Sequence, residues 1–321
     1  MVFGYDIITI GGATEDLFFT VDDYTFVTKT EKGIVQKLMA FEYGTKVGVP
    51  DVTSAYGGGA NNVAVQLAHL GFRVAMIGTV GRDARGQGII RNLEKQRVVS
   101  KFLHRTDKAS SGVSFILVQP GHDHTVFTHR GANDYLMIDR KARREIKKAK
   151  GVYLTSLSGN WKKVLPSIFS ANKNIAWNPG RLQIAAGLRF LSPFLKQTRI
   201  LICNKDEALD LVNSHSSRKI TDLRAALREL KKYVIGCVVI TNGEKGVVAY
   251  DGQKYYSEKA KKAKKVVDTT GVGDAFGASF LAGIKKYRGD IEPALELAAD
   301  NSALVLGHMG AQTGLEDIRR F

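Results

Sequence analysis

The sequence is poor in cysteine and proline and has no long hydrophobic run. Its 321 residues include only two cysteines, Cys203 and Cys237, each inside an apolar, strand-like segment. We expect buried free thiols there, because two such residues make neither a disulfide framework nor a metal cluster. No apolar run approaches the roughly 20 residues of a membrane-spanning helix. No basic, cleavable leader precedes the first apolar segment at residues 5–12. These absences predict a soluble cytoplasmic protein without a membrane partner.

Acidic residues are the scarcer charged class, with 31 Asp and Glu against 47 Lys and Arg, a formal net charge of +16. Such an excess suits nucleic acid, anionic small molecules or simply a basic cytosol. The basic residues concentrate in segments 140–151, 227–232 and 257–268, where aromatic side chains are scarce. We interpret two of these segments as the solvated faces of helices, and we do not expect nucleic acid to be the partner.

Short apolar segments alternate with helical patterns along most of the chain. In residues 61–71, for example, Val63, Leu67 and Leu70 form one stripe, and Gly71 is placed to end the helix. The alternation predicts an α/β fold in which helices cover a mostly parallel sheet. The strand-like segments are 6–12, 72–81, 151–157, 174–180, 199–204 and 236–243. The helical candidates are 61–71, 86–96, 139–150, 161–172, 206–213 and 221–232.

Two segments, 16–51 and 111–133, interrupt this alternation. They contain strand-like runs around turn residues and no helical pattern, so we expect hairpins. Because both interrupt one α/β core, we expect them to meet in space as a small antiparallel sheet that forms a lid. The predicted core then comprises residues 1–15, 52–110 and 134–321.

The segment 268–284, DTTGVGDAFGASFLAGI, places glycines and a carboxylate at the start of an apolar helix. Backbone N–H groups of Gly271, Val272 and Gly273 can bind an anion there, reinforced by the helix dipole. The same dipole favours the ionised form of Asp274, which can accept a proton from a hydroxyl. This combination suits phosphoryl transfer to an alcohol. The alternative is an ordinary helix start whose glycines only permit close packing.

A second glycine cluster, Gly57 to Gly59, precedes Asn61 and Asn62 at another predicted helix start. Backbone and amide groups could approach a polyhydroxylated ligand closely at such a place. The sequence contains no G-x-x-x-x-G-K-[ST] motif. Any nucleotide is therefore not held by a Walker-type P-loop.

Taken in order, these motifs resemble those of the ribokinase-like, phosphofructokinase-B-type family of carbohydrate and nucleoside kinases. The resemblance spans essentially the whole chain and implies a ribokinase-like three-layer α/β/α core with a small antiparallel lid. It implies a kinase that uses ATP and Mg²⁺ to phosphorylate a primary hydroxyl of a sugar or sugar-like substrate. It further implies a homodimer formed through the lid and allows activation by a monovalent cation. The motifs are GGATED at 11–16, GGGANNVAVQLAHLG at 57–71, NKDE at 204–207, TNGEKG at 241–246 and the segment 268–284.

The same resemblance implies roles for the residues of the helix start at 271–274. Asp274 is the expected catalytic base, which deprotonates the acceptor hydroxyl. Gly271, Val272 and Gly273 are expected to stabilise the charge on the transferred phosphoryl group.

The nucleotide and the metal are expected at two other motifs. Asn204 and Glu207 match an N-x-x-E element that organises Mg²⁺ through its water shell. Thr241 and Gly243 match a turn beside the nucleotide. Glu207 could instead be only a favourable charge in the first turn of a helix.

Asp16, Gly58 and Asn62 fall where members of the family hold the hydroxyls of the sugar. Asp16 could instead cap a turn and Asn62 a helix. Arg130 follows the second lid hairpin and could clamp an anionic group or the substrate rim, or pair with Asp134. The alternative enzyme is a nucleoside kinase, since the same scaffold accepts a ribose that carries a base. An alternative of another class is a non-catalytic relative that binds nucleic acid.

Overall fold

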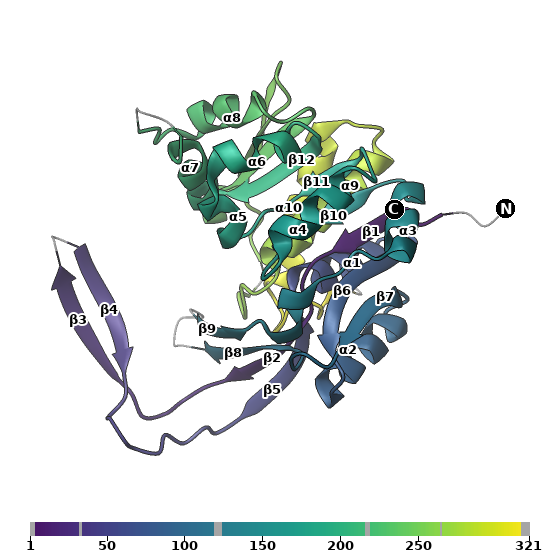
Figure 1. Ribbon diagram of the computed structural model, residues 1–321. Coiled ribbons are helices and arrows are strands. Elements are labelled where there is room, and N and C mark those ends of the chain that lie inside the picture. The colour runs from purple at the N-terminus through teal and green to yellow at the C-terminus, as the bar shows by residue number, and fades with distance from the viewer. Residues whose placement is uncertain (1–3, 32–33, 119–123, 216–218, 264, 316–321) are drawn as a thin grey trace.

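A nine-stranded sheet forms the centre of the fold (Figure 1). The computed structural model describes residues 4–31, 34–118, 124–215, 219–263 and 265–315. Seven neighbouring strands are parallel, and β14 and β15 add two antiparallel strands at one edge. In spatial order the strands are β15 (Tyr255–Glu258), β14 (Val247–Tyr250), β13 (Cys237–Thr241), β12 (Thr198–Asn204), β11 (Ile175–Trp177), β10 (Val152–Leu154), β1 (Ile7–Ile10), β6 (Val74–Gly81) and β7 (Val99–Thr106).

Helices cover both faces of this sheet because its strands are apolar on both sides. Ile7 and Ile200 belong to one buried cluster, whereas their neighbours Ile8 and Leu201 belong to the other. This confirms the predicted three-layer α/β fold. One face carries α1 (Gly59–His69), α2 (Ala84–Lys95), α9 (Val272–Lys286) and α10 (Ile291–Val305). The other carries α3 (Arg140–Lys148), α4 (Trp161–Phe169), α5 (Arg181–Ala185), α6 (Gly187–Leu195), α7 (Lys205–Asn213) and α8 (Leu223–Lys231).

Several details of the core follow the sequence predictions, and a few elements were missed. Gly71 adopts the left-handed φ of 86° just after α1, and Cys203 and Cys237 are buried free thiols. Helices α5 and α6 were not predicted, because the left-handed Gly187 divides their pattern into two short pieces. In the described ranges no helix is both long and apolar enough to cross a bilayer.

The two predicted lid segments do meet in space, in a four-stranded sheet that we call the lid sheet. Strands β2 and β5 are antiparallel, as are β8 and β9, but β2 and β8 pair in parallel. The parallel pair arises because β2 and β8 follow β1 and β7, two parallel core strands, and so leave the core in the same direction. The strands are β5 (Val52–Gly57), β2 (Thr14–Phe19), β8 (Gly112–Val118) and β9 (His124–His129). The sheet thus includes residues 52–57, which the sequence analysis assigned to the core.

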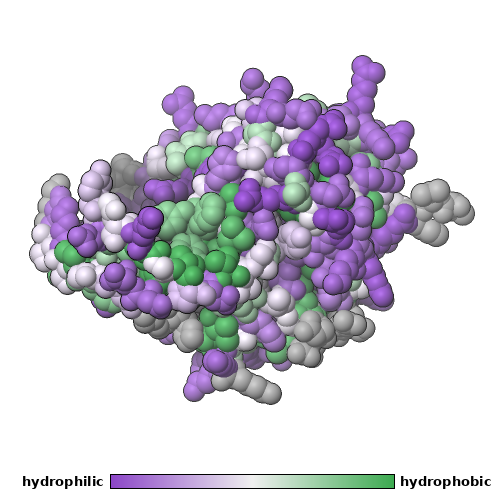
Figure 2. Space-filling view, turned by 90° about the horizontal axis from the view of Figure 1, so that it is seen from below, coloured by the Kyte–Doolittle hydropathy of each residue, from purple (hydrophilic) through white to green (hydrophobic). Residues whose placement is uncertain are grey.

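Strands β3 (Thr25–Glu31) and β4 (Ile34–Ala40) form a separate two-stranded hairpin that projects away from the rest of the molecule (Figure 1). Every residue of β3 is exposed. Figure 2 shows hydrophobic side chains gathered on the side from which this hairpin projects. The large exposed apolar side chains of the hairpin and lid sheet are Phe26, Val27, Val35, Leu38, Phe41, Val52, Phe115, Val126 and Phe127.

The direction of the strands decides where a ligand can bind. From β1 the chain proceeds to β6 and β7 on one side, and then to β10 through β13 on the other. The strand order therefore reverses beside β1, and the crevice outside the carboxyl ends of the strands at such a point is where α/β proteins bind ligands.

Candidate active site

The start of α9 lies in this crevice, against the start of α1. Gly271 precedes α9 with a left-handed φ of 76°, and a Cβ on it would lie only 2.1 Å from the Cβ of Ala311. Glycine is thus required at position 271 for both conformation and packing. A Cβ on Gly59, in the first turn of α1, would lie 3.3 Å from Oδ1 of Asp274. The close approach of the two helices therefore brings the Asp274 carboxylate beside the second glycine cluster.

The first turn of α9 offers backbone donors to an anion. Among the described residues, the N–H groups of Gly271, Gly273 and Asp274 find no acceptor, and that of Val272 contacts the Thr269 carbonyl at 3.4 Å. Gly273 is exposed, and a Cβ on it would meet nothing within 4 Å. Close packing therefore explains the glycine at position 271 but not the one at position 273. The alternative that both glycines only permit close packing of the helix start does not account for Gly273.

Asp274 is held by a hydrogen bond and is largely surrounded by protein. Nδ2 of Asn62 donates to its Oδ2 across 2.8 Å. Burial raises the pKa of Asp274 to about 6, the negative charge of Asp16 adds to this, and the bond from Asn62 opposes it. Burial is the largest of these three influences on the pKa. The carboxylate is still mostly ionised at neutral pH, as the sequence analysis expected.

Asn62 belongs to a longer chain of side-chain amides. Its Oδ1 accepts a bond of 3.1 Å from Nε2 of Gln312, whose Oε1 accepts one of 2.8 Å from Nδ2 of Asn92. The chain links α2, the C-terminal segment, α1 and α9. Asn62 therefore does not cap α1. The N-cap residue of that helix is Gly58, which has a φ of 92°. Sequence reasoning missed Gln312 and Asn92 because amides give no local signal of a distant partner.

Asp16 is 5% exposed on β2 and faces the glycine cluster. A Cβ on Gly57 would lie 1.8 Å from its Oδ2, so position 57 has no room for a side chain. Oδ1 of Asp16 accepts a 2.8 Å bond from the Thr14 hydroxyl, and burial raises the pKa of Asp16. Asp16 lies within a strand, so it does not cap a turn. Gly58 packs tightly on the segment after β1, since a Cβ there would lie 2.6 Å from Cα of Ala13.

The loop before Gly271 is tied down by Asp268, a buried residue to which the sequence analysis gave no role. Its Oδ1 accepts from the Thr270 N–H and its Oδ2 from the Gly310 N–H, each across 2.9 Å. The Thr269 hydroxyl lies 3.4 Å from Nδ1 of His124 at the start of β9. The lid sheet thus reaches the loop that presents the backbone donors.

A second group of predicted residues lies further along the same carboxyl edge of the sheet. Asn204 ends β12, and Thr241, which ends β13, is its register partner. Asn204 and Glu207 form a reciprocal cap on α7: Oδ1 of Asn204 accepts from the Glu207 N–H, and Oε2 of Glu207 accepts from the Asn204 N–H, each across 2.9 Å. Burial raises the pKa of Glu207. Gly243 lies in the following turn with a left-handed φ of 54° and open space around it.

The structure therefore brings Asp16, Gly58, Asn62 and the start of α9 together, and it places Asn204, Glu207, Thr241 and Gly243 along the same edge. Arg130 approaches the first group only through its backbone, because its carbonyl accepts from Nδ2 of Asn133, which also donates to the carbonyl of Ala13 beside Gly58. It is exposed after β9, and its side chain forms no hydrogen bond or ion pair with another described residue. The alternative ion pair with Asp134 is accordingly not formed.

A carboxylate beside free backbone donors, at the switch point of an α/β sheet, is the arrangement expected of a phosphotransferase that acts on an alcohol group. The model of the pfkB family carbohydrate kinases matches residues 32–318, and the chain therefore belongs to this family.

Curated relatives agree with this assignment. The chain is 29% identical over 255 residues to an uncharacterized sugar kinase of Archaeoglobus fulgidus, covering 78% of this chain and 97% of that protein. It is 31% identical over 230 residues to the ribokinase of Mus musculus, covering 69% and 68% of the two chains.

Solved structures share the fold. The nucleoside kinase of Methanocaldococcus jannaschii superposes with a TM-score of 0.76 and 23% identity, covering 98% of this chain and 97% of that one. The ribokinase of Arabidopsis thaliana, complexed with ribose and ATP, superposes with a TM-score of 0.78 and 20% identity, covering 97% and 95% of the two chains. The protein is thus a sugar or nucleoside kinase of ribokinase-like fold.

Proposed function

We propose that this protein transfers the γ-phosphoryl group of ATP to a hydroxyl, a primary one, on a sugar or sugar-like substrate. The observation that carries the proposal is the position of the Asp274 carboxylate in the same helical turn as the unengaged N–H groups of Gly271 and Gly273. A hydroxyl placed between the two could lose its proton to Asp274. The backbone donors would meet the charge that develops on the transferred phosphoryl group.

The substrate would lie between the lid sheet and the start of α1. Asp16 is suited to accept hydrogen bonds from its hydroxyls, because its carboxylate lies at the glycine cluster before α1, where the absence of a side chain on Gly57 makes room for it. Gly58 permits close approach of backbone to the ligand. Asn62, already bonded to Asp274, couples the position of the substrate to that of the base.

ATP and Mg²⁺ would lie toward β12 and β13. Glu207 uses one carboxylate oxygen for the α7 cap and keeps the other, which fits the hydrogen-bonding needs of water in the shell of Mg²⁺. Asn204 positions Glu207, since its own side-chain oxygen is engaged in the same cap. When bound, Mg²⁺ neutralises charge on the β- and γ-phosphates. Thr241 and Gly243 would border the nucleotide.

A nucleoside is the alternative substrate. A solved nucleoside kinase superposes on 98% of this chain with a TM-score of 0.76. This likeness supports a nucleoside substrate as well as it supports a sugar substrate. A ribose that carries a base would present its hydroxyls to Asp16 and Asp274 in the same way. Only the surroundings of the base, at the lid sheet, would differ.

We further propose a homodimer assembled through the lid. An isolated two-stranded hairpin is marginally stable in water, yet β3 and β4 project with apolar side chains such as Phe26, Val27 and Leu38 exposed. A second copy of the chain would cover these side chains and the unpaired edges of the hairpin.

A coupled assay of ADP release tests the proposed reaction. Purified protein with ATP and Mg²⁺ would be offered ribose, fructose, 2-keto-3-deoxygluconate, inositol, adenosine, guanosine and cytidine in turn, with the Asp274→Asn variant as the blank. We expect one sugar to be turned over far faster than the others. Turnover of a nucleoside alone would favour the alternative substrate, and ATP binding without turnover of any compound would contradict the proposed acceptors.

A further inference from the structure

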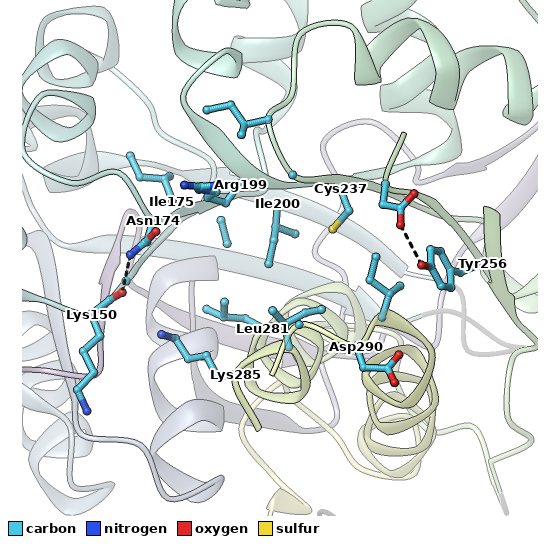
Figure 3. Close-up of a pocket in the computed structure, with 18 residues that line it drawn as sticks. Lys150, Asn174, Ile175, Arg199, Ile200, Cys237, Tyr256, Leu281, Lys285 and Asp290 are labelled. Atoms are coloured by element: carbon cyan, nitrogen blue, oxygen red, sulfur yellow. Dashed lines mark hydrogen bonds between the residues drawn. The ribbon is translucent and has the colours of Figure 1, made fainter. Parts of the chain in front are cut away.

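A cavity of about 500 Å³ opens at the edge of the central sheet opposite the candidate active site. Its wall is formed by the amino ends of parallel strands β10 to β13, the second half of α9 and the beginning of α10 (Figure 3). The parallel sheet separates it from the carboxyl edge, where Asp274 lies. None of the residues assigned to the kinase site lines it.

The cavity is polar at both ends and apolar in between. Figure 3 shows Lys150, Arg199 and Lys285 at one end and Asp290 at the other. The floor between the ends is built from the buried side chains Ile200, Cys237, Leu281 and Ile291, which belong to one core cluster. A ligand that fits this arrangement has an anionic group at one end and an apolar body.

At the basic end, Lys285 forms no ion pair among the described residues, although the charge of Asp6, which is paired with Lys150, acts on it from a greater distance. Its ammonium lies near the start of β10, because a Cβ on Gly151 would be 3.5 Å from its Nζ. The side chain is partly buried, burial lowers the pKa of Lys285, and it forms no ion pair or hydrogen bond with another described residue. Lys150 differs, since its Nζ lies 2.7 Å from Oδ1 of Asp6. A partly buried cation that forms no direct ion pair favours an anion in the space it faces.

Arg199 provides a second cation without a partner. It precedes Ile200 on β12 and forms no ion pair within the described ranges. A guanidinium offers several donors in a fixed plane, which matches phosphate and carboxylate oxygens. Lys285 and Arg199 come from opposite walls of the cavity, α9 and β12, and can therefore contact one anionic group from two sides (Figure 3).

The acidic end does not compete for the anion. Asp251 accepts bonds from the Gln253 and Lys254 N–H groups and from the Tyr256 hydroxyl. Asp290 accepts from the Glu292 N–H and thereby caps α10, so the N-terminus of that helix already has its negative partner. These carboxylates repel an anion and orient it toward Lys285 and Arg199.

We propose that this cavity is a second ligand site, which binds a small organic anion through Lys285 and Arg199 and holds its flat apolar body against Ile200 and Leu281. The volume is within the range of small-molecule sites. Lys285 lies 11 residues after Asp274 on α9, about 16 Å along the helix axis, so ligands at the two sites would contact opposite ends of one helix. The inference does not depend on the identity of the kinase substrate.

Pyridoxal 5′-phosphate is a direct probe, because it is a flat aromatic phosphate with an aldehyde. The neutral amine of a lysine condenses with the aldehyde, losing water to form an imine. Borohydride then delivers hydride to the imine carbon and leaves a stable secondary amine that peptide mass spectrometry locates. The reaction would be run with saturating ATP and Mg²⁺, which protect lysines at the kinase site. We expect Lys285 to be modified at least tenfold faster than Lys286.

An arginine variant with its matched control, and a competing ligand, test whether the modification of Lys285 depends on the cavity. Arg199→Gln should slow the modification of Lys285 at least fivefold, whereas Arg189→Gln, on the exposed surface of α6, should not. Pyridoxine 5′-phosphate, which lacks the aldehyde, should protect Lys285. Modification of Lys285 and Lys286 at equal rates, or the same rate in both arginine variants, would overturn the proposal.

Calorimetric titration with pyridoxine 5′-phosphate provides an independent readout without covalent chemistry. Lys285→Met should weaken its binding at least tenfold, and Lys286→Met should leave it unchanged, with melting temperatures measured to show that both variants fold. Absence of binding to the wild-type protein, or equal weakening in both variants, would also overturn the proposal.

Discussion

Asn62 on α1 donates a 2.8 Å hydrogen bond to Asp274 on α9, across 212 residues of sequence. The bond joins the two glycine-rich helix starts into one site. Its other consequence is chemical, because it favours the charged form of a carboxylate whose pKa is raised by burial. The position and the protonation state of the proposed base thus depend on the same contact.

Replacement of Asp274 by Asn should abolish most turnover. We expect kcat to fall by about 10²- to 10⁴-fold, the contribution typical of a general base, with ATP affinity nearly unchanged. Steady-state kinetics and nucleotide titration measure the two effects. Asp107→Asn, which removes an exposed carboxylate paired with Arg82, is the matched control. Wild-type turnover in Asp274→Asn would remove the base from the mechanism.

The raised pKa of Asp274 also predicts how activity and stability vary with pH. Activity should fall as pH drops through about 6, where the base becomes protonated. Stability has the opposite trend, because the folded state binds this proton more tightly than the unfolded state, in which the pKa of the carboxyl is near 3.8. The stabilisation that comes from binding the proton is therefore lost as pH rises from about 4 to about 6. Asp274→Asn should therefore melt at a higher temperature than wild type at pH 8 and at a similar one at pH 4.

Loss of the Asn62 amide should change the pH profile. In Asn62→Ala the acidic limb of kcat/KM should move up by about one pH unit, the equivalent of one hydrogen bond. Activity should recover partly at pH 9, a response that a merely structural defect would not show. Asn92→Ala, at the far end of the amide chain, should leave the limb in place. An unshifted limb in Asn62→Ala would show that this bond does not set the protonation of Asp274.

The two glycines of the anion-binding turn should respond differently to alanine. Gly273→Ala adds a methyl group in open space, so the melting temperature should be kept while kcat falls by between about 10- and 100-fold through displacement of the phosphoryl group. Gly271→Ala meets Ala311 and an unfavourable φ, so it should lower the melting temperature. Full activity in Gly273→Ala would argue against a phosphate at this turn.

A charge on the projecting hairpin should break the proposed dimer. Leu38 is 42% exposed on β4, and Leu38→Lys would place an ammonium in the apolar contact. Light scattering coupled to gel filtration should show a dimer for wild type and a monomer for this variant. Gln253→Lys, in the exposed turn between β14 and β15, adds the same charge away from the hairpin and should stay dimeric. A wild-type monomer at micromolar concentration would contradict the lid dimer.

Local patterns were sufficient to predict much of this fold. Apolar strand segments, the stripe of Val63, Leu67 and Leu70, and the left-handed Gly71 depend on neighbours within a few residues, and the structure confirms them. The grouping of Asp16 with Gly58 and Asn62 was predicted from the order of motifs. The parallel pairing of β2 with β8 was not, because it depends on where two distant segments leave the core.

The sequence by itself determined the α/β class, the two glycine-rich helix starts and the carboxylate that follows one of them, since backbone conformation and hydrophobic period are encoded locally. Only the tertiary structure decided that Gly271 is packed while Gly273 is open, and that burial raises the pKa of Asp274. It alone also decided that Gln312 and Asn92 extend the contact of Asn62. It also placed Lys285 and Arg199 across one cavity. Packing density, desolvation and long-range amide contacts depend on which remote side chains become neighbours, and those neighbours exist only once the chain has folded.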